Sequence, residues 1–147
     1  MRTHNFGKAV VAGLIGTLAM TVVMLMAPMM GMPPMPIGNM LAGFMHVPVA
    51  LGWGMHFMIG AVLALGYVYI FASKLPGSPM VRGAEFSLIP WLMAQVVVNP
   101  MMGAGVFASN TPAPLLFVMG SLIGHVAFGA VLGSVYGAEL SAAAQPA

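Results

Sequence analysis

Two histidines that lie within long hydrophobic stretches are the residues of this chain with the clearest capacity for chemistry. His56 and His125 are each followed by Gly-Ala-Val-Leu four residues later and by Tyr eleven residues later, and the two copies are offset by 69 residues. A histidine ring can bind a metal ion or haem iron, transfer a proton or form hydrogen bonds. Because ionisable groups inside a membrane are costly and often functional, this pair is the first candidate site.

A second repeated motif indicates an internal duplication. Pro-Met-Met-Gly occurs at 28–31 and again at 100–103, an offset of 72 residues that nearly equals the histidine offset. Two matches at almost one spacing predict two copies of a two-helix unit. Both copies would cross a bilayer in the same direction, so we expect a pseudo-two-fold axis along the membrane normal.

The composition is that of a polytopic membrane protein. Of the 147 residues, 61% are hydrophobic and 4% are charged, whereas a soluble domain has roughly 25% charged residues. Four apolar stretches are long enough to cross a bilayer, at about 9–30, 49–72, 84–103 and 115–138. We therefore expect an all-α fold, with 1–147 forming a single transmembrane domain built as a four-helix bundle.

The charged residues predict the orientation of these stretches. All four basic residues lie before the first stretch or between the second and the third, whereas the loops at 31–48 and 104–114 carry no charged residue. By the positive-inside rule, both termini are expected in the cytoplasm. The first stretch is longer than the roughly 7–15 apolar residues of a signal peptide, so we expect it to be retained as a helix.

Small residues accompany each histidine at four-residue spacing. The stripes are Gly52, His56, Gly60 and Ala64 on one helix and Ser121, His125, Gly129, Gly133 and Gly137 on the other. Such stripes allow helix backbones to approach closely in lipid. One interpretation is therefore a packing seam, in which each histidine is hydrogen-bonded to Ser121, Gln95, Asn99 or a backbone carbonyl.

Two other interpretations of the histidine pair remain open. In the first, His56 and His125 lie across the diagonal of the bundle and are the axial ligands of a haem b. In the second, they form a two-histidine metal or proton-relay site, although stable zinc sites usually have four ligands.

The 17 methionines suggest a separate metal site. Several crowd the first loop predicted to face outward, and the candidate ligands there are Met29, Met32, Met35 and His46. Thioethers are soft ligands suited to Cu(I). The alternative is that methionine serves as a flexible apolar filler, since it is abundant throughout the chain.

Several classes of function lack the residues that they need. The chain has no cysteine, and both of its acidic residues are glutamates, Glu85 and Glu139, at predicted helix ends. These facts exclude disulfides, thiolate catalysis and a Ser-His-Asp triad. The four basic residues form no clustered face for nucleic acid, so we expect neither an enzyme nor a nucleic-acid partner.

From about residue 50 to 137 the chain resembles the YagU-like family of small bacterial inner-membrane proteins. The motifs that carry this resemblance are His56 with Gly66-Tyr67, Leu75-Pro76, Gly83, Pro100-Met101-Met102-Gly103 and Gly124-His125. The resemblance implies a helical bundle that crosses the bacterial inner (cytoplasmic) membrane several times. It implies no activity, ligand or catalytic residue.

Three functions are consistent with these patterns. The first is a non-enzymatic membrane protein that serves as an accessory subunit and contacts a partner, or a second copy of itself, through its glycine faces. The second is an electron-transfer protein that binds haem b through His56 and His125. The third is a methionine- and histidine-rich protein that binds or transports copper or a small solute.

Overall fold

The computed structural model describes residues 4–142, with side chains up to residue 137. The described residues form helices and loops, and none of them lies in a strand. The α-helices are α1 (Phe6–Met26), α2 (Ile37–Met45), α3 (Val49–Gly66), α4 (Pro79–Met93), α5 (Asn99–Met101) and α6 (Pro114–Ala142). Between them lie 3-10 turns at Ala27–Met30 and Val106–Ala108 and π-helical turns at Tyr67–Phe71 and Ala94–Val98.

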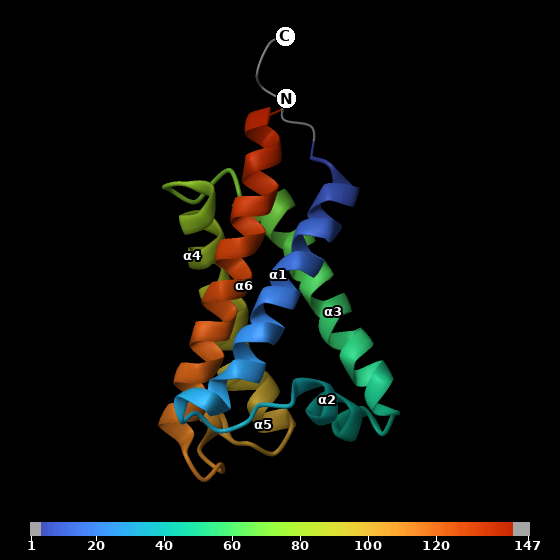
Figure 1. Ribbon diagram of the computed structural model, residues 1–147, viewed down its shortest axis with the longest axis vertical. Coiled ribbons are helices and arrows are strands. Elements are labelled where there is room, and N and C mark those ends of the chain that lie inside the picture. Colours follow the sequence, from blue (N-terminus) through green and yellow to red (C-terminus); the bar gives the residue numbers. More distant parts are fainter. Residues whose placement is uncertain (1–3, 143–147) are drawn as a thin grey trace.

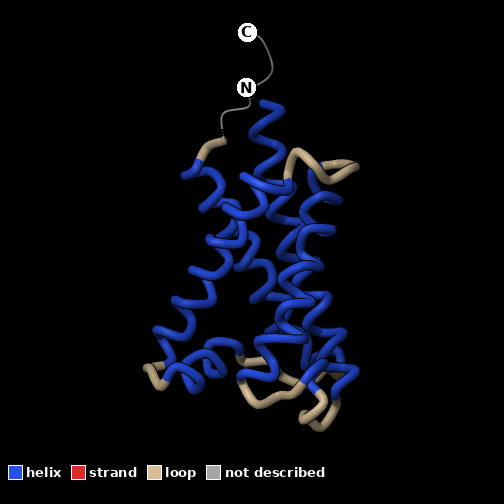
Figure 2. Tube along the Cα trace, turned by 180° about the vertical axis from the view of Figure 1, so that it is seen from behind, coloured by secondary structure: helices blue, strands red, loops and turns tan. Residues whose placement is uncertain are grey.

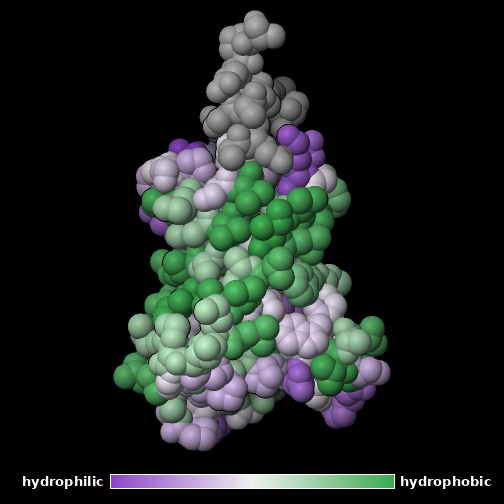
Figure 3. All heavy atoms as spheres, in the orientation of Figure 1, coloured by the Kyte–Doolittle hydropathy of each residue, from purple (hydrophilic) through white to green (hydrophobic). Residues whose placement is uncertain are grey.

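Four of the helical segments are long and apolar enough to cross a membrane. These spans are Phe6–Met30, Val49–Phe71, Pro79–Met101 and Pro114–Gly137. Figure 3 shows apolar residues over the middle of the face in view, with polar residues toward both ends. The prediction of an all-α protein with four membrane-length helices is therefore confirmed.

The third span begins at Pro79, before the predicted boundary at residue 84. Proline is favoured at the first position of a helix, and serine is favoured as the cap before it. Here the Ser78 hydroxyl accepts a hydrogen bond from the backbone N–H of Val81 at 3.5 Å. The charged side chains of Arg82 and Glu85 lie inside this first part of the helix, which is why hydropathy alone places the start too late.

The first loop contains a helix that was not predicted. Gly38, Leu41 and Ala42 of α2 are buried, and they recur at the three- and four-residue spacing of one helix face. This face packs against α3, where an added Cβ at Gly38 would meet the ring of Trp53. Figure 1 shows α2 lying across one end of the molecule rather than along the spans.

The four spans are packed most closely at one end. α6 packs along both α1 and α4, and α1 also packs along α3. The second span approaches the third mainly through Tyr67–Phe71, where the rings of Tyr67 and Phe71 each lie 5.3 Å from the ring of Phe86. In Figure 2 the helices converge at the end that carries the loop at 72–78, here called the narrow end, and diverge toward α2 and α5, here called the wide end.

Small residues allow the close helix contacts. A Cβ at Gly13 of α1 would meet Ala64 of α3, and one at Gly16 would meet Phe128 of α6. The contact between α4 and α6 is closer still, because Gly83 lies against the backbone of Gly129. A cluster of buried side chains fills the space beside these contacts: Ala9, Ala12, Ala64, Tyr67, Val68, Phe86, Phe128, Leu132 and Tyr136.

The two Pro-Met-Met-Gly motifs end their spans with the same backbone turn. Gly31 has a φ of 80° and Gly103 a φ of 82°, values in the left-handed region that favours glycine. In each copy the glycine N–H donates to the proline carbonyl of the motif at 3.1 Å. The recurrence of the motif therefore reflects a shared way of ending a helix.

Candidate functional site: the intramembrane histidines and the methionine clusters

His56 lies on α3 and is bonded to a threonine of α1. The His56 ring is buried, and its Nε2 atom lies 3.1 Å from the Thr21 hydroxyl oxygen. The Thr21 hydroxyl donates its only proton to the carbonyl oxygen of Thr17 at 2.8 Å. His56 Nε2 is therefore the donor to Thr21, and the neutral ring keeps its lone pair on Nδ1.

His125 lies on α6 and is bonded within its own helix. Its Nδ1 atom lies 2.8 Å from the carbonyl oxygen of Ser121 and 3.5 Å from the Ser121 hydroxyl. A carbonyl oxygen only accepts hydrogen bonds, so Nδ1 carries the proton and the neutral ring keeps its lone pair on Nε2. The hydrogen bonds thus assign opposite tautomers to the two histidines.

A chain of amide and hydroxyl groups joins the third span to α6. The Asn99 side-chain N–H donates to Gln95 Oε1 at 3.0 Å, and Gln95 Nε2 donates to the Ser121 hydroxyl at 3.1 Å. All three side chains are buried, and Gln95 is fully buried. Gln95 lies in the π-helical turn Ala94–Val98, a type of turn that is frequent at functional sites.

Together these residues form a polar layer to which all four spans contribute. The layer consists of Thr21, His56, Gln95, Asn99, Ser121 and His125. Its hydrogen bonds fall into one group around His56 and another that ends at His125. Gln95 and Asn99 were predicted as partners of the histidines, and Gln95 reaches His125 through Ser121.

The partner of His56 was missed by the sequence analysis. The available signal was the pair Thr17 and Thr21, two hydroxyl residues four positions apart in an apolar helix. Threonine hydroxyls often bond to the carbonyl four residues earlier, so this pattern alone does not indicate an interhelical bond.

The glycines beside the histidines are in contact with neighbouring helices. A Cβ at Gly52 would meet Gly38 and Ala42 of α2, and one at Gly60 would meet Thr17 of α1. On α6, Cβ atoms at Gly129 and Gly133 would meet the backbone of α4. These stripes are therefore helix-packing surfaces within the chain, as the first interpretation predicts.

The predicted methionine and histidine ligands are only partly brought together. The sulfur atoms of Met32 and Met35 both lie beside Gly120 of α6. Met29 is 84% exposed, and His46 is exposed at the C-terminal end of α2, where its φ of 55° reverses the chain.

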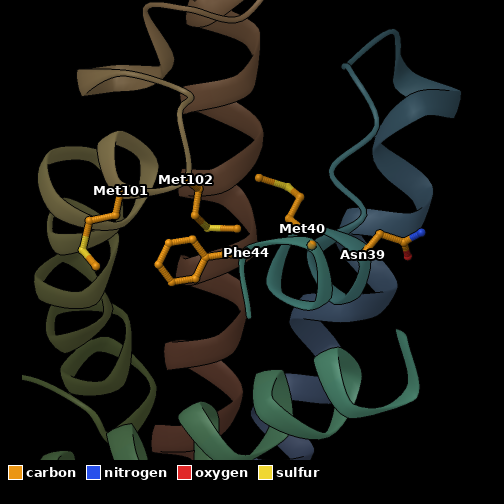
Figure 4. A pocket seen from close by; sticks show the side chains of 6 residues that line it. Asn39, Met40, Phe44, Met101 and Met102 are labelled. Carbon is orange, nitrogen blue, oxygen red and sulfur yellow. The ribbon is translucent and has the colours of Figure 1, made fainter. Parts of the chain in front are cut away.

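A different group of methionines lines a pocket at the wide end. The pocket has a volume of about 350 Å³ and is lined by Asn39, Met40, Gly43, Phe44, Met101 and Met102. Figure 4 shows that its walls come from α2 on one side and from the end of the third span on the other. The sequence analysis did not group these residues, because it did not predict α2.

The comparisons with known proteins place the chain in a family. No curated protein and no solved structure matches it. The model of a family of unknown function, DUF6789, matches residues 3–146, and this match does not link the chain to the YagU-like family. Because the match covers nearly the whole sequence, the chain belongs to DUF6789.

Proposed function

We propose that this chain is a non-enzymatic integral membrane protein of a bacterial inner membrane that serves as an accessory subunit of a larger membrane complex. The observation that carries this proposal is the outward face of α3. Gly54, Met58, Val62 and Gly66 follow one another at four-residue spacing, and a Cβ added at Gly54 or Gly66 would meet nothing within 4 Å. These two glycines therefore serve no close contact within the described part of the chain.

A partner helix gives this face a physical role. Glycine in a helix costs roughly 1 kcal/mol relative to alanine, and intrachain packing offsets that cost at Gly60 and Gly133 but not at Gly54. Small residues allow a second helix to approach closely in lipid, and Gly54 and Gly66 supply two such positions about three turns apart on this face. Met58 and Val62, which lie between the two glycines, are 56% and 61% exposed.

Site-directed cross-linking tests the partner surface. The chain has no cysteine, so Met58→Cys introduces a single thiol at the centre of the face. In native membranes we expect this variant to cross-link to one protein partner, or to a second copy of the chain. Leu18→Cys, on an exposed face of α1, is the control and should not give this product.

A glycine variant makes the cross-linking test specific. Adding Gly54→Leu to Met58→Cys should abolish the cross-link while leaving the folded chain intact, because space around Gly54 is open. An undiminished cross-link in the double variant, equal cross-linking from Leu18→Cys, or no cross-link from Met58→Cys would each refute a partner on this face.

The proposal includes an orientation with both termini in the cytoplasm. The charge pattern predicts it. The even number of spans in the described residues, and the start of α1 lying at the same end as the end of α6 (Figure 1), support both termini being on one side. A reporter that is active only in the cytoplasm should be active when fused after Gln145 and inactive when inserted at Thr111. The opposite pattern would overturn the orientation.

Haem b binding by His56 and His125 is the second candidate. His125 favours it, because its Nδ1–H donates to a backbone carbonyl and leaves Nε2 for a metal, as is usual for histidine ligands. His56 fits less well, because its Nε2 is bonded to Thr21. An absorption spectrum of the purified protein and of its histidine variants is the test.

A further inference from the structure

The pocket at the wide end brings together three thioethers from two separate segments. Met40 and Phe44 are four residues apart on α2, and Met101 and Met102 are consecutive at the end of the third span. In Figure 4 the side chains of Met40 and Met102 extend toward each other beside the ring of Phe44, whereas the side chain of Met101 points away from both. The turn at Gly103 fixes the backbone that carries the two consecutive methionines.

We propose that this pocket binds Cu(I) through Met40 and Met102, with Met101 as a third ligand once its side chain, which turns away from them in Figure 4, changes rotamer. Thioether sulfur is a soft, neutral donor that selects Cu(I) over Zn²⁺, Mg²⁺ or Ca²⁺. The hard donor in the lining is the amide of Asn39, and its side chain points away from the methionines (Figure 4). The donor set of the pocket therefore matches a soft monovalent cation and suits a hard divalent cation poorly.

The size of the pocket and the nature of its walls allow the ligands to converge. A volume of about 350 Å³ leaves room for the methionine side chains to change rotamer, and methionine has three rotatable bonds and a polarizable sulfur. The ring of Phe44 adds an aromatic face, which attracts a cation. A leucine at each of the three positions would occupy similar space but would supply no ligand.

This site is distinct from the one predicted by sequence. Met32 and Met35 lie together over Gly120, while Met29 and His46 are exposed and outside this pocket. The proposal also uses none of the residues of the α3 face. Failure of the copper-binding test would therefore leave the accessory-subunit proposal intact, and the reverse also holds.

Metal titration of the purified, full-length protein tests the proposal. The probes are Cu(I) kept reduced by ascorbate and, as its redox-stable analogue, Ag(I), with Zn²⁺ as the hard comparison. We expect one equivalent of Cu(I) or Ag(I) and no Zn²⁺, with sulfur as the bonded neighbour in the copper X-ray absorption spectrum. Met40→Leu and Met102→Leu should each lower the affinity by about tenfold or more.

Two exposed methionines provide matched controls. Met58→Leu and Met93→Leu make the same change on α3 and α4 and should leave the affinity unchanged. Leucine conserves the volume of methionine, so all four variants should keep the thermal midpoint of the apo-protein. The proposal is overturned if the wild type does not bind, if the pocket variants bind as the wild type does, or if only Met32→Leu and Met35→Leu abolish binding.

Discussion

Replacing Gly133 by leucine should markedly lower the thermal midpoint of the purified protein in detergent. A Cβ at Gly133 would meet the carbonyl oxygen of Pro79 and the backbone of Gly83. Backbone atoms cannot rotate away as a side chain can, so α4 and α6 must separate. Overpacking of this kind typically costs about 1–3 kcal/mol, even though the substitution makes the helix more hydrophobic.

Gly54→Leu is the matched control for this substitution. It makes the same change on α3, where a Cβ meets nothing within 4 Å, and leucine is also the better helix former. If Gly133→Leu were as stable as Gly54→Leu, the close contact between α4 and α6 would not exist.

His56→Ala and His125→Ala should each destabilise the protein, and their effects should add. His56 is bonded to Thr21 of α1, whereas His125 is bonded to Ser121 of its own helix. Losing either ring removes a hydrogen bond and buried contacts, at a cost of about 0.5–3 kcal/mol. Additive losses in thermal or denaturant unfolding, with no visible absorption band, would support histidines that act separately.

A shared haem would give the opposite result. A Soret band would be present in the wild type and lost in either variant, and the double variant would add little, because the cofactor is lost only once.

A threonine variant calibrates the measurement of additivity. Thr21→Val should be non-additive with His56→Ala, whose bond it removes, and additive with His125→Ala.

Hydropathy predicts the spans well because each span must form its backbone hydrogen bonds within the helix and present apolar side chains to lipid. The second span was predicted within a residue of its observed bounds. The start of the fourth span was predicted equally well, while helix α6 continues to Ala142, past the predicted end. The short helix α2 was missed because nine residues are too few for a hydropathy signal, and its burial depends on contact with Gly52 and Trp53 of α3. Tertiary contacts of this kind have no local signature.

The polar layer was predicted in its residue types but not in its pairings. His56, His125, Gln95 and Asn99 were identified because polar side chains are rare in these helices. Which group bonds to which depends on helix rotation, and the π-helical turn at Ala94–Val98 changes that rotation without a pattern in the sequence. The pocket was missed for a related reason, since four of its six lining residues lie on α2.

The divergence of the helices from the narrow end to the wide end means that the two leaflets of a bilayer encounter different cross-sectional areas of protein. α3 leans away from the other spans toward one leaflet only (Figure 2). A bilayer accommodates a mismatched inclusion by deforming, at a modest energetic cost. That cost is lower where the bilayer curves so that the leaflet at the wide end lies on the convex side. We therefore expect the free energy of insertion to depend on local membrane curvature, independently of any ligand or partner.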